Sequence, residues 1–122
     1  MKTKLTYILL FFVCIQTYSQ RKYAADRYFK EYAYKKSADL YSQIFKNGDS
    51  TKLVLERLGD SYYYNTETEQ AENWYNKLIT YYKEEITPEY YFRYAQALKS
   101  NGKYDESDAM MKKFRALDGS DS

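Results

Sequence analysis

Apolar residues between Leu55 and Leu78 recur every three or four positions on both sides of a polar segment. They form two runs: Leu55, Leu58 and Tyr62, then Ala71, Tyr75 and Leu78. A spacing of three and four residues is the period of one buried helix face. The stretch therefore predicts two helices that pack against each other as a hairpin.

The same pattern recurs before and after this stretch. A shift of thirty-four residues toward the amino terminus aligns Tyr75 with Tyr41, and a shift of thirty-six in the other direction aligns it with Met111. Similar helical hairpins at such a period are typical of a helical solenoid. We therefore predict an all-α fold of three hairpins in a short right-handed superhelix. The domain is expected to span residues 20–117, with hairpins at 21–49, 51–84 and 87–117.

Gly59 lies inside the first helix of the middle hairpin. Glycine in a helix interior costs roughly 1 kcal/mol relative to alanine. That cost is explained if the partner helix approaches the backbone closely, so we predict a tight contact at Gly59.

Trp74 is open to two interpretations, a side chain packed in a seam or an exposed anchor for a partner.

Turn and cap signals separate the predicted helices. Gly48 suits a left-handed cap, and Asp49 or Ser50 is expected to begin the next helix. Thr66 and Glu69 have the spacing of a capping box.

The third hairpin has boundary signals of its own. Thr87 is expected as an N-cap with Pro88 at the first helical position, where its missing N–H costs nothing. Asn101 and Gly102 form the expected turn between the two helices. Residues 118–122 are polar and are expected to form a flexible tail.

The first nineteen residues have a different character. Lys2 and Lys4 precede an apolar run over residues 5–15, and small or polar residues follow up to Ser19. This is the pattern of a secretory signal peptide, and cleavage after Ser19 would make Gln20 the first mature residue. A permanent anchor is the weaker interpretation, because a spanning helix needs roughly 20 apolar residues. Lipidation at Cys14 is also less favoured, because a lipidated signal requires a small residue where Val13 stands.

Removal of this leader changes the charge balance. The chain has 19 basic and 17 acidic residues, and the leader holds two lysines and no acid, which leaves 17 of each sign. A balanced charge gives no field for recruiting nucleic acid, and none is expected as a partner. The chain has no histidine, and its one cysteine lies in the leader, so the mature part lacks the residues of most hydrolase and zinc sites. We expect no enzyme activity, no cofactor and no metal.

The aligned positions resemble the tetratricopeptide repeat. The middle hairpin carries the best match, at Leu55, Leu58, Gly59, Tyr62, Ala71 and Tyr75. The third hairpin departs by Ser107 and Met111, and the first hairpin is the most degenerate. The resemblance implies the fold and a role in protein interaction.

A narrower resemblance concerns the amino-terminal part. The leader ending in Tyr-Ser-Gln, residues 23–29 and the segment Ala38–Tyr41 are similar to the repeat region of Bacteroidota OmpA-family, PorE-like envelope proteins. That resemblance implies a periplasmic scaffold associated with the outer membrane and with type IX secretion, working beside PorP/SprF-like proteins. It also implies later domains that bind peptidoglycan, which this chain does not include.

A partner is expected in the groove that first helices line in tetratricopeptide arrays. Transfer by position assigns to this groove Asp26, Phe29, Glu56, Asp60, Tyr63, Tyr64, Phe92, Gln96 and Lys99. These residues combine aromatic anchors with polar groups that can fix the register of a bound peptide. Two alternatives remain at this stage: a solvated inner face, or a tyrosine-rich groove that binds glycan or peptidoglycan.

Overall fold

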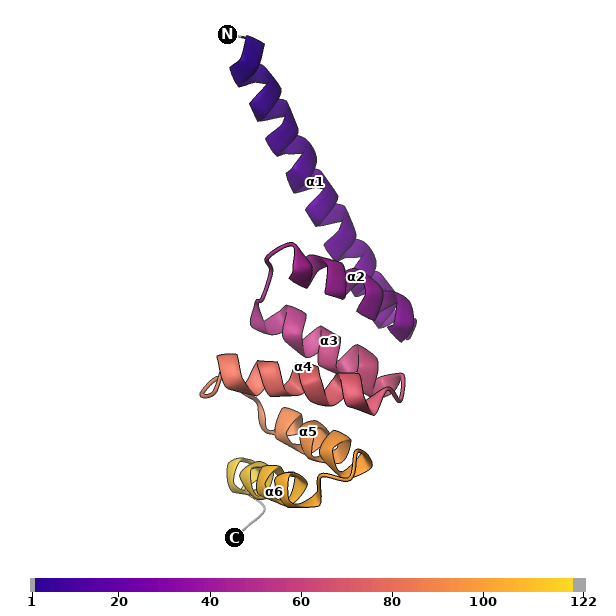
Figure 1. Ribbon diagram of the computed structural model, residues 1–122, viewed down its shortest axis with the longest axis vertical. Coiled ribbons are helices and arrows are strands. Elements are labelled where there is room, and N and C mark those ends of the chain that lie inside the picture. Colours follow the sequence, from indigo (N-terminus) through magenta and orange to yellow (C-terminus); the bar gives the residue numbers. More distant parts are fainter. Residues whose placement is uncertain (1, 120–122) are drawn as a thin grey trace.

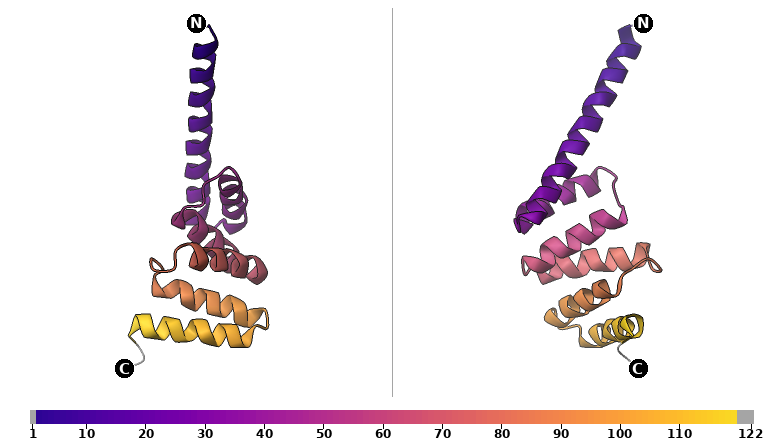
Figure 2. Two further views of the ribbon diagram at one scale, coloured as in Figure 1. Left: turned by 60° about the vertical axis from the view of Figure 1, so that its left-hand side comes forward. Right: turned by 180° about the vertical axis from the view of Figure 1, so that it is seen from behind.

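A computed structural model describes residues 2–119, and this part of the chain is all-helical. Its six helices are α1 (Lys2–Lys30), α2 (Tyr34–Lys46), α3 (Lys52–Tyr64), α4 (Thr68–Tyr81), α5 (Pro88–Ser100) and α6 (Tyr104–Asp118). The main contacts join helices that follow one another in the sequence. The helices consequently stack in chain order, and the two ends of the chain lie at opposite ends of the stack (Figures 1 and 2).

The connections inside the three expected hairpins have the same turn geometry, and the α2–α3 connection at Gly48 shares its hydrogen-bond pattern. Tyr32, Thr66 and Gly102 each take a positive φ, of 62°, 61° and 80°. At each turn this residue's N–H donates to a carbonyl three residues earlier, and the next N–H donates to a carbonyl five residues earlier. Tyr32 and Thr66 adopt the left-handed conformation despite their side chains, which is uncommon outside glycine. The fold thus repeats a local geometry at the spacing that the sequence predicts.

Thr66 corrects the predicted capping box. Its hydroxyl donates to the carbonyl oxygen of Asn65 at 2.6 Å instead of capping α4. The N-cap of α4 is Glu67, without a side-chain cap bond. The prediction was wrong because a Thr-x-x-Glu spacing also arises when the threonine itself forms the preceding turn.

Three further helix boundaries bear on the predictions. The N-cap of α3 is Thr51, so the expectation of Asp49 or Ser50 was wrong; the Asp49 side chain instead accepts a bond from the Thr51 N–H at 3.1 Å. Thr87 and Pro88 occupy the predicted positions at the start of α5. At the end of α6, Asp118 is the last helical residue and Gly119 takes a left-handed cap, while residues 120–122 lie outside the described part.

The predicted tight contact at Gly59 is confirmed. A Cβ atom at this position would lie 2.4 Å from Cε1 of Tyr75, a side chain with no exposed surface. Corresponding positions in the neighbouring helix pairs also hold small residues, Ala25 and Ala95. Their carbonyl oxygens accept hydrogen bonds from Ser37 and Ser107, at 3.1 and 2.7 Å. Small side chains therefore let the helices approach at all three levels.

The core consists of two clusters of buried residues. One joins α1, α2 and α3, and the other joins α3, α4 and α5. Trp74, Phe45 and Tyr62 pack against both clusters, and the rings of Phe45 and Trp74 meet edge to face with centroids 4.9 Å apart. Trp74 therefore packs between the two clusters, as its interpretation as a packed side chain requires.

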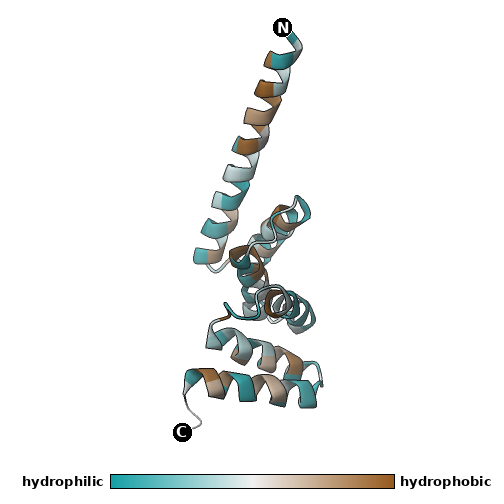
Figure 3. Ribbon diagram, turned by 90° about the vertical axis from the view of Figure 1, so that its left-hand side faces the viewer, coloured by the Kyte–Doolittle hydropathy of each residue, from teal (hydrophilic) through white to brown (hydrophobic). Residues whose placement is uncertain are grey.

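The amino-terminal half of α1 projects away from the stack (Figure 1). This half carries many apolar residues (Figure 3). Their side chains are open to solvent, from Ile15 at 49% exposed to Tyr7 at 71%. The expected cleavage position after Ser19 falls inside this continuous helix. None of the helices within residues 2–119 combines the length and apolar character needed to cross a membrane.

Candidate functional site

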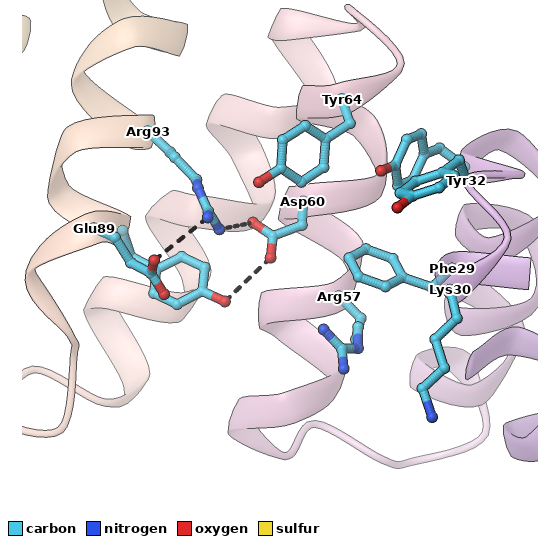
Figure 4. A pocket seen from close by; sticks show the side chains of 10 residues that line it. Phe29, Lys30, Tyr32, Arg57, Asp60, Tyr64, Glu89 and Arg93 are labelled. Atoms are coloured by element: carbon cyan, nitrogen blue, oxygen red, sulfur yellow. Dashed lines mark hydrogen bonds and ion pairs between the residues drawn. The ribbon is translucent and has the colours of Figure 1, made fainter. Parts of the chain in front are cut away.

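A hollow of about 610 Å³ opens between α1, α3 and α5 (Figure 4). We call it the central pocket. It is lined by Phe29, Lys30, Tyr32, Tyr34, Arg57, Asp60, Tyr64, Glu89, Tyr90 and Arg93. Helical spacing explains the set, because Arg57, Asp60 and Tyr64 follow one another at steps of three and four along α3.

Asp60 forms the floor of the central pocket and is 3% exposed. Three donors meet its carboxylate: the Tyr75 hydroxyl at 2.7 Å, the Tyr90 hydroxyl at 3.1 Å and Nη1 of Arg93 at 2.9 Å. Nη2 of Arg93 lies 3.4 Å from Glu89, so this guanidinium is held between two carboxylates (Figure 4). A buried carboxylate with three donors forms a satisfied polar network, which fixes the side chains around it.

The pKa values of this network follow from burial and from the charge of Asp60. Burial raises the pKa of Asp60, while Arg93 and the hydroxyls of Tyr75 and Tyr90 oppose that rise. Burial and the neighbouring Asp60 both raise the pKa of Tyr75 and of Tyr90. Burial alone would lower the pKa of Arg93, but Asp60 raises it. The two tyrosines therefore remain protonated donors and Arg93 remains a cation near neutral pH.

Arg57 is held more loosely on the other side of the central pocket. Its guanidinium lies 4.3 Å from the centroid of the Phe29 ring, a cation–π contact. Its Nε lies 3.7 Å from Oδ1 of Asp26, and Oδ2 of Asp26 is closer to Lys30, at 3.1 Å. This Nε is buried and has no hydrogen-bond partner among residues 2–119.

Aromatic rings form the rim of the central pocket. The Tyr34 ring is central, with centroids 5.6 Å from Phe29, 6.2 Å from Tyr32 and 5.2 Å from Tyr64. Arg93 lies over the Tyr64 ring at 5.4 Å. Tyr32 is 78% exposed, so an apolar surface with polar tips faces solvent here.

Of the residues assigned to the groove from the sequence, Phe29, Asp60 and Tyr64 line the central pocket. Asp26 lies beside it, through its contacts with Lys30 and Arg57. The other five residues do not line it: Glu56, Tyr63, Phe92, Gln96 and Lys99.

The two aromatic residues among these five pack elsewhere. Tyr63 packs toward Tyr75, with centroids 6.1 Å apart, and Phe92 packs on Phe114 at 5.3 Å. Sequence reasoning missed Arg57, Tyr90 and Arg93. The two arginines gave a signal in the sequence, since Arg57 and Arg93 occupy corresponding positions of two repeats.

Residues 2–119 contain no cluster of three or more side chains suited to hold a metal ion. No family model matches the sequence, and no curated protein matches it. The geometry of the central pocket and the repeated pattern of the chain are therefore the basis for a function.

Proposed function

We propose that this protein is an exported scaffold of the periplasm and outer membrane that binds a protein partner in its central pocket. We further propose that residues 20–117 form three tetratricopeptide-type hairpins in a right-handed superhelix. The repeated turns at Tyr32, Thr66 and Gly102 support this assignment, as do the small residues at the three helix crossings.

The observation that carries the binding role is the central pocket itself. All three expected hairpins contribute to it, and its aromatic rim surrounds a buried and fully bonded carboxylate. Rings held by mutual packing lose little conformational freedom on binding, which favours recognition of a peptide segment. Arg93, which Asp60 holds in place, and the exposed Glu89 provide polar contacts that set its register.

Export is proposed from the leader. Two lysines precede an apolar run whose side chains are largely exposed, on a part of α1 that projects from the stack. Mass spectrometry of the amino terminus of protein from the envelope fraction tests this proposal. We expect the mature chain to begin at Gln20, and an intact Met1 would refute cleavage.

The partner class is proposed from the resemblance to OmpA-family, PorE-like proteins. Under that proposal the chain acts in the envelope beside PorP/SprF-like outer-membrane proteins, either through partners or through further domains. An in-frame OmpA-type domain downstream of Ser122 would strengthen the proposal, and its absence would weaken this family assignment without affecting the pocket.

Site-specific photo-crosslinking in the native cell tests the binding role. A benzoylphenylalanine in place of Tyr32 reports on the central pocket, and one in place of Tyr104, which is 63% exposed and outside it, serves as the control. We expect one defined protein adduct at position 32 that is lost when Phe29→Ala and Tyr64→Ala are combined. Phe92→Ala, a matched aromatic truncation outside the pocket, should leave the adduct unchanged. Equal crosslinking at positions 32 and 104 would contradict the proposal.

A second candidate is a glycan- or peptidoglycan-binding module. The exposed Tyr32 ring beside Tyr34 and Tyr64 favours it, because aromatic faces stack on sugar rings. Calorimetric titration with muropeptides and oligosaccharides separates the two candidates. Saturable heat that disappears in Tyr32→Ala would favour the glycan, and the absence of heat would favour the protein partner.

A further inference from the structure

A second hollow, of about 430 Å³, lies beside the central pocket between α1, α2 and α3. We call it the side pocket. It is lined by Ile15, Tyr18, Ser19, Lys22, Tyr23, Asp26, Lys30, Tyr41, Leu53 and Arg57. Most of these residues follow Ser19, so leader removal would leave the greater part of the wall in place.

The side pocket holds the two buried side-chain polar atoms that lack a hydrogen-bond partner within residues 2–119. They are the hydroxyl of Tyr41 and Nε of Arg57. Tyr41 has no exposed surface. A buried polar group without a partner is destabilising, so two such groups lining one hollow require an explanation.

The chain contains a template for what these groups bind. Asp60, Tyr75 and Arg93 correspond to Asp26, Tyr41 and Arg57 after shifts of thirty-four, thirty-four and thirty-six residues. In the first of these triads, Oδ1 of Asp60 accepts bonds from the Tyr75 hydroxyl at 2.7 Å and from Arg93 at 2.9 Å. A single carboxylate oxygen therefore satisfies a tyrosine and an arginine in this geometry.

The corresponding triad is not closed in the same way. Asp26 pairs with Lys30 at 3.1 Å, and its contact with Arg57 is longer, at 3.7 Å. Burial raises the pKa of Tyr41, and Asp26 adds to the rise while Arg57 opposes it, so the hydroxyl keeps its proton. Tyr41 and Arg57 thus both line the side pocket, and both are donors.

We propose that the side pocket binds an organic carboxylate, whose oxygen accepts hydrogen bonds from Tyr41 and Arg57. Both groups donate, and Nε–H of arginine can only donate, so the ligand atom must be an acceptor. Lys22, Lys30 and Arg57 outnumber Asp26 in the wall, which favours an anion over a neutral acceptor. Tyr23 and Leu53 supply apolar surface for the body of the acid. The carboxylate could come from a free acid or from the carboxyl terminus of a peptide.

The proposed acid site depends on Tyr41. This residue lines the side pocket but not the central pocket, where the protein partner is proposed to bind. Failure of the crosslinking experiment would leave it unaffected. Failure of the acid titration would likewise leave the partner proposal unaffected.

Chemical-shift titration of the protein as recovered from cells, with its amino terminus verified, tests the site. Phenylacetate is the probe, and phenylacetamide is its neutral match. We expect saturable shifts around Tyr41 and Arg57 with the acid, and at least tenfold weaker binding of the amide. No binding of the acid, or equal binding of the two, would overturn the proposal.

Two matched variants separate binding from folding. Tyr41→Phe should keep the melting temperature of the wild type and weaken phenylacetate binding about tenfold, because it removes one hydrogen bond to a charged group. Tyr75→Phe, at the corresponding position, should lower the melting temperature and leave acid binding unchanged. Unchanged acid binding in Tyr41→Phe would overturn the proposal. Short peptides with a free or an amidated carboxyl terminus then identify the source: tighter binding of the free form points to a peptide end, and equal weakness of both points to a free acid.

Discussion

Two corresponding triads, each an aspartate, a tyrosine and an arginine, differ in how they are bonded. At Asp60 the tyrosine and the arginine both reach the carboxylate within 2.9 Å. At Asp26 the arginine Nε is 3.7 Å away and the tyrosine hydroxyl has no partner. A repeated sequence position thus carries a closed network at one level of the stack and an open one at the next.

The neighbours of each triad explain the difference. Tyr90 adds a third donor at Asp60. The corresponding residue near Asp26 is Val54, whose side chain has no donor. Lys30 forms an ion pair with Asp26. The corresponding residue near Asp60 is Tyr64, which has no charge near neutral pH. The closed triad thus satisfies its donors within the fold, while the open triad leaves two buried donors without a partner.

The largest expected effect is at the closed triad. Asp60→Ala removes the acceptor of three donors, and the free energy of unfolding should fall by about 3 kcal/mol. This is the lower end of the range for breaking a buried ion pair, because the Arg93 side chain is 20% exposed. Asp26→Ala is the matched control and should cost no more than about 1 kcal/mol, since that carboxylate is 36% exposed. Urea unfolding measures both. Similar losses for the two variants would contradict the comparison.

The next effect comes from Gly59, which lets Tyr75 reach Asp60. Gly59→Leu would force a side chain into the Tyr75 ring, and we expect a loss of about 2 kcal/mol, within the range for overpacking. Lys99→Leu places the same side chain at an exposed helical position and should change stability little. A thermal melt of Gly59→Leu that matches the wild type would rule out the close approach.

The smallest expected effect is at Lys30. Lys30→Met releases Asp26, so that its carboxylate can turn toward Tyr41 and Arg57 and close the triad. We expect a gain of about 0.5 kcal/mol, because the exposed pair that is lost contributes little. Lys35→Met removes a similar pair with Asp39, together with a longer contact with Glu67, and should give no gain. A loss of stability in Lys30→Met would mean that Asp26 cannot close the triad.

Helical periodicity predicted the helices well, because burial of one face decides where a helix lies. The Gly59 contact was also predictable, since glycine in a helix interior needs a steric reason. The capping box at Thr66 failed because the same residue types serve caps and turns, and only the backbone conformation distinguishes them.

The site was less accessible to sequence reasoning. Phe92 and Arg93 are neighbours in sequence, but consecutive helical residues point about 100° apart, so only one of them can face the central pocket. Transfer of the groove positions from tetratricopeptide arrays selected Phe92. In the structure it is Arg93 that lines the pocket, where it donates a hydrogen bond to the buried carboxylate of Asp60. Which donors a buried carboxylate collects depends on how α4 and α5 are placed beside α3, and that geometry is not encoded in any local pattern.

Double-mutant cycles at the two triads test the central claim, that one triad holds the fold and the other is open to a ligand. The cycle of Tyr75→Phe with Asp60→Asn should give a coupling free energy of about 2 kcal/mol, as expected for a hydrogen bond to a buried charge. The cycle of Tyr41→Phe with Asp26→Asn should give a value near zero in the ligand-free protein. Equal coupling in the two cycles would show that both triads are closed in solution and would contradict the account.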